Sequence, residues 1–199
     1  MTYIVVEGPI GVGKTVLTRL LGERLAMPTV FEQFEENPFL SNFYADRARY
    51  AFQTEVFFLL NRYRQQGSVV KPAAAEGNVA SDYLFAKTKL FAGMNLVGDE
   101  LELFEQLYEA LSKQVPTPDL VVYLRASVDT LMARIYQRDR WFERSMERSY
   151  MERLSHVYES FFDTYTESPV LKIDTDNLDL VRDVKAQQET ISMIAAARS

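Results

Sequence analysis

The feature that most constrains the fold is a glycine-rich segment between a predicted strand and a predicted helix. Residues 8–15 fit the pattern G-x-x-x-x-G-K-T, in which glycines let the backbone curl so that successive N–H groups face an anion. The run TYIVV before it is typical of a buried strand, and the leucines at 17, 20, 21 and 25 share one helical face. A turn from strand to helix suits a phosphate loop, since the helix N-terminus adds partial positive charge.

This context predicts a site for a nucleoside triphosphate with a magnesium ion. Lys14 is expected to reach the β- and γ-phosphates, and the Thr15 hydroxyl is expected to bind Mg²⁺. The residues expected to surround the phosphates are Gly8, Pro9, Ile10, Gly11, Val12, Gly13, Lys14 and Thr15. A chance match in a glycine turn is the alternative, and the flanking strand and helix disfavour it.

Length, composition and charge narrow the class of protein. At 199 residues with 47% hydrophobic residues, the chain is expected to form a single domain, residues 1–199. A formal net charge of −6 argues against a nucleic-acid partner. The absence of cysteine excludes disulfides and fits a reducing compartment. We expect no signal peptide before the first strand and no membrane span, and therefore a cytoplasmic protein without a membrane partner.

Strand-like and helical segments alternate along the chain. The strand-like runs cover residues 3–7, 29–31, 79–82, 120–124 and 170–173. The longest helical pattern after the glycine-rich loop covers 47–66, others begin near 99, 128 and 149, and a last one closes the chain. This alternation predicts an α/β fold with a parallel sheet covered by helices on both faces. In such sheets, ligands bind at the carboxyl ends of the strands.

Two carboxylates follow predicted strands beside the glycine-rich loop. Glu32 comes at the end of the second strand and Asp82 at the end of the third. One carboxylate would hold Mg²⁺ through water, because hard cations prefer oxygen ligands. The other would take a proton from an attacking hydroxyl. A solvated loop acid is the alternative for each.

An arginine cluster stands out in this net acidic chain. Six of the 22 lysines and arginines fall between residues 134 and 153. Arginines one helical turn apart, followed by another at the helix break, can clamp phosphates as a mobile lid, here over about residues 138–148. The three arginines assigned to that role are Arg134, Arg138 and Arg140. Acids are interleaved with the cluster, so a solvated helix of ion pairs is the alternative, and we favour it for Arg148 and Arg153.

The ordered set of motifs resembles the deoxynucleoside kinase family. The motifs that carry the resemblance, in family order, are the glycine-rich loop, FEQFEENPFLSNFY, YAFQTEVFFLLNRYRQ, SDY, PDLVVYLRAS and RIYQRDRWFE, and they reach to about residue 179. Within the family, the chain is most similar to the bacterial enzymes that phosphorylate deoxyguanosine. The resemblance implies a P-loop kinase with a five-stranded parallel sheet flanked by helices, an arginine-rich lid, ATP as phosphate donor with Mg²⁺, and a homodimer.

The resemblance also implies roles for individual side chains. It makes Glu32 the general base for the 5′-hydroxyl of a deoxynucleoside, and Tyr44 with Glu143 the pair that holds the 3′-hydroxyl. It places Asp176 in a loop that borders the adenine of ATP. It also implies that Phe91 belongs to the segment that stacks on the nucleoside base.

One departure from the family pattern concerns the charge near the reacting phosphates. The acid-Arg-Ser that usually follows the third strand is here Asp82-Tyr83-Leu84. An arginine is therefore missing, and the lid arginines or Lys87 are the candidates to replace its charge. Asp82 itself remains the expected partner of Thr15 in holding Mg²⁺.

Glu55, on the long predicted helix, bears on the identity of the base. The resemblance places it where many relatives that phosphorylate deoxyadenosine or deoxycytidine carry glutamine. A glutamine amide matches the acceptor and donor that adenine or cytosine presents, whereas a carboxylate accepts from both N1–H and the 2-amino group of guanine. Glu55 therefore predicts deoxyguanosine, with Arg62 or Lys87 donating to O6. An ion pair of Glu55 with Arg62 or Lys87 is the alternative, because a buried acid needs partners.

Two other functions are compatible with a phosphate loop. A thymidylate-type nucleoside monophosphate kinase needs cations near its acceptor phosphate. The segment after the second strand instead holds Glu32, Glu35 and Glu36 without an arginine, which favours a neutral hydroxyl acceptor. A nucleotide-binding switch would need neither a base-reading acid nor an arginine lid in its own chain.

Overall fold

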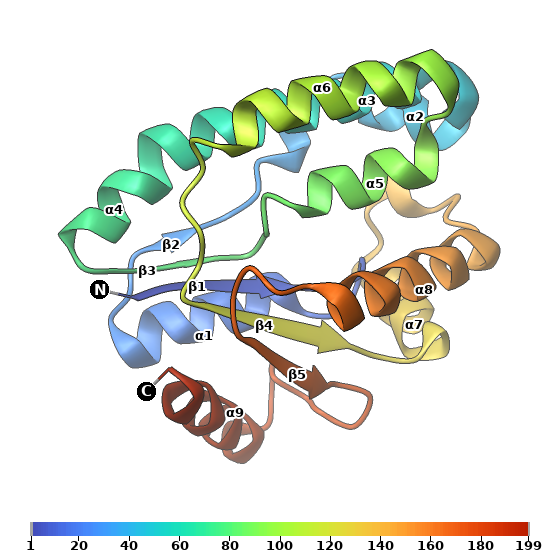
Figure 1. Cartoon of the computed structure of the whole chain (residues 1–199). Coiled ribbons are helices and arrows are strands. Elements are labelled where there is room, and N and C mark those ends of the chain that lie inside the picture. The colour runs from blue at the N-terminus through green and yellow to red at the C-terminus, as the bar shows by residue number, and fades with distance from the viewer. Residues whose placement is uncertain (1, 199) are drawn as a thin grey trace.

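A five-stranded parallel sheet forms the centre of the molecule (Figure 1). The computed structural model describes residues 2–198. The strands are β1 (Thr2–Glu7), β2 (Thr29–Val30), β3 (Asn78–Ser81), β4 (Leu120–Arg125) and β5 (Val170–Asp174). They lie in the order β2-β3-β1-β4-β5, and each neighbouring pair is parallel. The predicted α/β fold with a five-stranded parallel sheet is confirmed.

Helices lie on both sides of this sheet. Within the described residues they are α1 (Lys14–Leu25), α2 (Leu40–Ala45), α3 (Arg47–Gln65), α4 (Lys71–Glu76), α5 (Lys87–Asn95), α6 (Gly98–Ser112), α7 (Val128–Arg138), α8 (Arg148–Thr164) and α9 (Val184–Ala197). Figure 1 shows α3, α5 and α6 on one side of the sheet and α1 and α9 on the other. Between residues 2 and 198, no helix is both long and apolar enough to cross a membrane.

The order of the strands determines where a ligand can bind. From β1 the chain passes to β2 at one edge, whereas from β3 it passes to β4 on the opposite side of β1. The connections therefore diverge between β1 and β3, where Val5 is opposite Ser81. Such a divergence leaves a crevice at the carboxyl ends of the two strands. The glycine-rich loop follows β1 there, and Asp82 follows β3.

The long helix α3 carries two residues of interest. It begins at Arg47 and is capped by Asp46, whose side chain accepts a hydrogen bond from the Arg49 backbone N–H at 3.3 Å. It continues through a π-helical turn, Gln66–Val70, directly into α4. Glu55 and Arg62 are seven positions apart and both are buried, because residues two turns apart share a helical face. They therefore lie on the face that α3 turns toward the site.

Two hydrophobic clusters hold these layers together. The larger contains the apolar residues of the central strands and of α1, α7 and α8. The smaller lies within the helical layer, where Leu59 of α3, Ala92 of α5 and Phe104 of α6 are all fully buried. Because α3 packs against α5 and α6 in this second cluster, the side chains that it directs to the site have a rigid support.

Candidate active site

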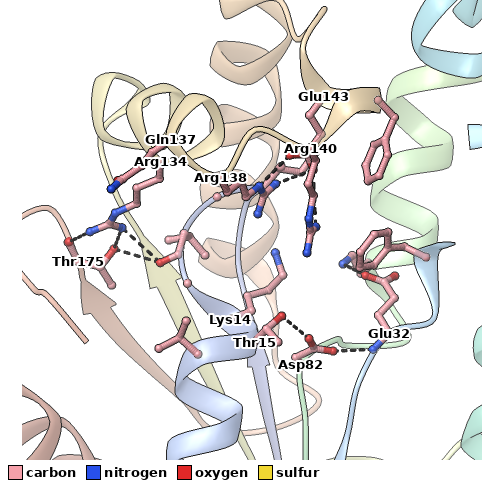
Figure 2. Close-up of a pocket in the computed structure, with 18 of the residues that line it drawn as sticks. Lys14, Thr15, Glu32, Asp82, Arg134, Gln137, Arg138, Arg140, Glu143 and Thr175 are labelled. Carbon is pink, nitrogen blue, oxygen red and sulfur yellow. Dashed lines mark hydrogen bonds and ion pairs between the residues drawn. The ribbon is translucent and has the colours of Figure 1, made fainter. Parts of the chain in front are cut away.

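A cavity of about 930 Å³ opens at the carboxyl ends of the strands. It is bounded by the glycine-rich loop, α3, α5, the end of α7 with the following turn, and the loop after β5 (Figure 2). The structure brings together around it the residues predicted for the site, namely Ile10, Gly11, Val12, Gly13, Lys14, Thr15, Glu32, Tyr44, Glu55, Arg62, Asp82, Lys87, Phe91, Arg134, Arg138, Arg140, Glu143 and Asp176. Gly8 and Pro9 belong to the same loop.

The glycines of the loop meet requirements that other residues would not. Gly11 and Gly13 have φ angles of 86° and 110°, in the region that L side chains rarely adopt. Gly8 has a φ of 149°, and a Cβ there would lie 2.2 Å from the backbone oxygen of Leu124. The loop can therefore take this shape only with glycine at these positions.

Lys14 is enclosed by the loop that precedes it. Its Nζ donates to the backbone oxygens of Gly8 at 2.7 Å and of Pro9 at 3.0 Å. Burial, and then the nearby charge of Lys87, lowers the pKa of Lys14 to about 8. An ammonium group in this position is ready to exchange loop carbonyls for an anion that enters the loop.

Thr15 and Asp82, predicted to hold magnesium, are in direct contact. The Thr15 hydroxyl donates to Asp82 Oδ2 at 2.6 Å, and the Glu32 backbone N–H donates to Oδ1 at 2.7 Å (Figure 2). No group of three or more His, Cys, Asp or Glu side chains that could hold a metal occurs in residues 2–198. Two oxygen ligands nonetheless fit Mg²⁺, which binds few protein groups and fills its shell with water and phosphate.

Glu32 lies in the crevice between two buried cations. Its Oε1 accepts from Arg62 Nε at 2.8 Å and from Arg62 Nη2, and its Oε2 accepts from Lys87 Nζ at 3.0 Å. Burial by itself would raise the pKa of Glu32, but Arg62 and Lys87 outweigh it and hold that pKa well below its usual range. Glu32 is therefore an ionised carboxylate with its partners already in place.

Arg62 contacts Glu32 rather than Glu55. Besides its two bonds to Glu32, it donates through Nη1 to Thr88 Oγ1 at 2.9 Å, and its guanidinium lies 4.7 Å from the centre of the Phe58 ring. Burial lowers the pKa of Arg62, but the charge of Glu32 reverses the effect and the net shift is upward. The residue predicted to donate to the base is thus occupied in orienting the predicted general base.

Glu55 has a different environment from the one expected of a paired acid. It is 2% exposed, its Oε1 accepts from Asn95 Nδ2 at 2.8 Å, and its Oε2 has no hydrogen-bond partner among the described residues. The alternative in which Glu55 forms an ion pair with Arg62 or Lys87 is wrong, because both cations bind Glu32 instead. Burial raises the pKa of Glu55 to about 7.

The turn after α7 brings two of the predicted lid arginines onto Glu143. Both Oε atoms of Glu143 accept from Arg138, and Arg140 Nη1 lies 3.8 Å from Oε1 (Figure 2). The Arg140 guanidinium also lies 4.4 Å from the ring centre of Phe34. Arg148 forms exposed ion pairs with two acids at 2.6 and 3.0 Å, which confirms the ion-pair alternative for that residue.

Arg134 differs from the lid arginine that was predicted. Its guanidinium donates to the backbone oxygens of Val12 at 3.3 Å, Thr175 at 2.6 Å and Leu178 at 3.3 Å, and to Thr175 Oγ1 at 2.9 Å (Figure 2). These four bonds use the donors that a phosphate would need. In this structure Arg134, which lies one turn before the end of α7, instead links the glycine-rich loop to the loop after β5.

Asp176 and Phe91 complete the predicted set. Asp176 Oδ1 accepts from the Ser127 backbone N–H at 2.9 Å and from its hydroxyl at 2.8 Å, which joins the loop after β5 to the start of α7. Phe91 is partly buried and meets Tyr158 edge-on, with ring centres 6.3 Å apart. Both line the cavity.

Glu7 is a buried acid that supports the glycine-rich loop from beneath and was not predicted from the sequence. It is fully buried at the end of β1. Its Oε1 accepts from the Gly8 N–H at 2.8 Å and the Tyr158 hydroxyl at 3.0 Å, and its Oε2 accepts from the Leu84 N–H at 2.7 Å. An acid at the end of an apolar strand was the available signal, since a buried carboxylate needs several partners.

Lys87 is one of the candidates to replace the charge of the missing arginine. Tyr83, which occupies the position of that arginine, is fully buried in the hydrophobic core. Lys87 is 5% exposed, contacts Glu32, and lies 3.9 Å from Glu7 Oε1. It therefore brings a positive charge to the crevice from the first turn of α5.

Comparison with known proteins decides the family. The family model described as "Deoxynucleoside kinase" matches residues 4–197. The chain belongs to the deoxynucleoside kinase family. A deoxyguanosine kinase of Bacillus subtilis (strain 168) is 36% identical, and the aligned region covers 90% of this chain and 89% of that enzyme. A deoxyadenosine/deoxycytidine kinase of the same strain is 31% identical, and the aligned region covers 98% of this chain and 92% of that enzyme.

Solved structures agree with this assignment. A deoxyadenosine kinase from M. mycoides with bound dATP superposes with a TM-score of 0.82 at 25% identity, covering 98% of this chain and 100% of the other. This chain is thus a kinase that phosphorylates nucleosides. The relatives are named for different nucleosides, so their names do not identify the base that this enzyme binds.

Proposed function

We propose that this deoxynucleoside kinase transfers the γ-phosphoryl group of ATP to the 5′-hydroxyl of deoxyguanosine, giving dGMP and ADP. The observation that carries the choice of base is the buried carboxylate of Glu55, whose Oε2 faces no hydrogen-bond donor within the described chain. A buried acceptor left without a partner is costly. It fits a site that a ligand with hydrogen-bond donors completes.

Guanine supplies those donors. Its N1–H and 2-amino group are adjacent, and a carboxylate offers acceptors to both, with lone pairs left even at the oxygen that binds Asn95. Adenine and cytosine would place a ring nitrogen lone pair against the ionised carboxylate. For O6 of guanine, Lys87 is the better donor, since in the described part of the chain its ammonium group makes one hydrogen bond, to Glu32, whereas Arg62 makes three, to Glu32 and Thr88.

The residues proposed to carry out phosphoryl transfer lie around the glycine-rich loop and the lid. The 5′-oxygen forms a bond to the γ-phosphorus while the bond from that phosphorus to the bridging oxygen of ADP breaks, and Glu32 accepts the hydroxyl proton. Lys14, Arg138 and Arg140 would neutralise the transferring charge. A magnesium ion held by Thr15, and through water by Asp82, would neutralise the donor phosphates.

Two further features belong to the proposal. Tyr44 and Glu143 would hold the 3′-hydroxyl, because both line the cavity next to the lid at residues 138–148.

The whole chain would act as a single domain and as a cytoplasmic homodimer. Sedimentation velocity distinguishes a dimer from a monomer.

The decisive experiment exchanges Glu55 for glutamine. Glu55→Gln places an N–H₂ donor against N1–H or the 2-amino group of guanine, so we expect kcat/KM for deoxyguanosine to fall about 10- to 150-fold. The values for deoxyadenosine and deoxycytidine should hold or rise. Steady-state assays of four deoxynucleosides with ATP and Mg²⁺ measure this, with Glu36→Gln as the control because Glu36 is exposed.

The pattern across substrates separates the explanations. An equal loss for all four nucleosides would assign Glu55 a structural role. Unchanged ratios between nucleosides would contradict the base-reading role of Glu55 and the preference for deoxyguanosine. The Glu36→Gln control should leave both rates and ratios unchanged.

A further inference from the structure

Among residues 2–198, Glu55 is a buried acid without a charged partner in direct contact. The groups that face it are Arg62 on its own helix, Glu32 after β2, Lys87 and Asn95 on α5, and Tyr150 on α8. The two cations among them are bound to Glu32 at hydrogen-bond distance. The sole hydrogen bond to Glu55 within the described chain comes from the neutral amide of Asn95, at 2.8 Å. Within residues 2–198, no direct ion pair therefore holds the carboxyl group in its ionised form, and burial outweighs the more distant charges of Arg62 and Lys87.

We infer that the protonation state of Glu55 selects between two classes of base, so that the ionised carboxylate takes guanine and the neutral carboxylic acid takes adenine or cytosine. This inference rests on the proposed role of Glu55 as the residue that reads the base. A neutral carboxylic acid presents one O–H donor beside one acceptor oxygen. Adenine at N1 and N6, and cytosine at N3 and N4, present the complementary acceptor and donor. Protonated Glu55 thus imitates a glutamine.

The groups around Glu55 allow this change near neutral pH. Burial places the pKa of Glu55 at about 7. Burial, and then the charge of Glu55, raises the pKa of Tyr150 to about 12, so Tyr150 stays neutral. Glu32 stays ionised and Arg62 stays protonated, because the pKa of the first is lowered and that of the second raised. Of these groups with a shifted pKa, Glu55 is the one that titrates in the physiological range.

The direction of the effect follows from proton linkage. Guanine binds the form of Glu55 without the proton, and adenine binds the form with it, so the two complexes differ by one proton. Raising the pH therefore increases the ratio of kcat/KM for deoxyguanosine to kcat/KM for deoxyadenosine. The increase approaches about tenfold per pH unit if each form accepts only its own base.

Competition between the two nucleosides measures this ratio directly. Equal amounts of deoxyguanosine and deoxyadenosine are incubated with the enzyme, ATP and Mg²⁺ from about pH 6 to about pH 8, and the two monophosphates are separated and quantified. Titration of Lys14, of the donor or of the lid affects both products equally and cancels. Deoxyinosine keeps N1–H, so its ratio to deoxyguanosine should stay constant. The Glu55→Gln variant has no titrating group at position 55, so its ratio of deoxyguanosine to deoxyadenosine phosphorylation should not change with pH.

A second measurement detects the proton itself. The infrared band of a protonated carboxylic acid, taken as the difference between the enzyme and Glu55→Gln, should be present near pH 6 and absent near pH 8. Deoxyadenosine should preserve the band to higher pH, and deoxyguanosine should remove it at lower pH. No such band at pH 6 would overturn the inference.

The outcomes distinguish this inference from the proposed function. A flat ratio in the unmodified enzyme, with Glu55→Gln still shifting preference away from deoxyguanosine, overturns the inference and leaves the base-reading role intact. A Glu55→Gln enzyme with the ratio of the unmodified enzyme at every pH overturns the base-reading role as well. A ratio that rises with pH in the unmodified enzyme and is flat in the variant supports both.

Discussion

Glu32 shows how a single side chain is prepared for chemistry by distant partners. Arg62 and Lys87 keep it ionised and fix both of its oxygens. A carboxylate with so low a pKa is a weak base, so proton transfer from a hydroxyl must be coupled to phosphoryl transfer rather than precede it. Orientation and proton acceptance at the moment of transfer are then its proposed contributions.

Substitution of Glu32 tests this role at the residue scale. Glu32→Gln should lower kcat about 10²- to 10⁴-fold, because the amide cannot accept the proton. Nucleoside binding, measured by isothermal titration, should change little. Some stability should be lost as well, since two buried cations lose their anion, and circular dichroism establishes that the variant is folded. Glu36→Gln, an exposed acid on the same segment, is the matched control.

A value of kcat within about threefold of the unmodified enzyme would remove Glu32 from proton transfer, because general-base catalysis contributes much more than that. A comparable loss in Glu36→Gln would instead show that the whole segment is sensitive to substitution. Neither result is expected from the positions of the two acids, one enclosed and one exposed.

At the scale of elements, the turn between α7 and α8 links two subsites. Glu143, proposed to hold the 3′-hydroxyl, accepts from Arg138, proposed to clamp phosphates. Charge-assisted bonds of this forked kind are directional. Entry of the nucleoside and closure over the phosphates should therefore be coupled through this pair.

The lid prediction compares two arginines of the same turn. Arg138→Ala should lower kcat at least tenfold, as loss of a transition-state donor typically does by about 10²-fold, and should raise KM for the nucleoside because Glu143 loses its support. Arg144→Ala removes an exposed pair with Asp139 and should behave like the unmodified enzyme. Steady-state kinetics with ATP and nucleoside varied separately measures both constants.

Equal effects of the two substitutions would indicate that the turn needs charge in general and not Arg138 in particular. A change in melting temperature with kcat unaltered would assign Arg138 to the surface ion pairs.

At the scale of the whole molecule, the proposed base-reading site opposes stability. Glu55 has its pKa raised from 4.5 to about 7 in the folded protein. Its contribution to stability is therefore present below about pH 4.5 and is lost as the pH rises to about 7. A site that needs its ligand to complete its hydrogen bonds commonly carries such a cost.

Glu55→Gln should for this reason stabilise the free protein at neutral and higher pH. The gain in the free energy of unfolding should be negligible below about pH 4.5 and of order 3 kcal/mol above about pH 7, at about 1.4 kcal/mol for each unit of pKa shift. Denaturant unfolding at several pH values measures the difference. A variant no more stable than the unmodified protein at pH 8 would contradict the burial cost assigned to Glu55, and Glu36→Gln should show no such gain.

The fold could be predicted from the sequence because its signals are local. Strand β1, the glycine-rich loop and α1 follow one another within 25 residues, and each is specified by the residue types of its own segment. The five strands lie where the β-branched runs predicted them. The helices α2, α4 and α5 were not predicted, because they are at most nine residues long and show little apolar periodicity.

The sequence also predicted part of the cavity lining. Glu32 and Asp82 follow from strand ends, because carboxyl ends of parallel strands meet at one edge of a sheet, whereas the residues of α2 and α5 and the acid of the lid turn came from the family resemblance. Only the tertiary structure decided which of them touch. Arg62 meets Glu32 across 30 positions, Asn95 meets Glu55 across 40, and Tyr158 meets Glu7 across 151. Local propensity carries no information on such pairs, because they depend on how separate elements pack. That packing orients Glu32, occupies Arg134 and leaves one buried oxygen of Glu55 without a hydrogen-bond partner among the described residues.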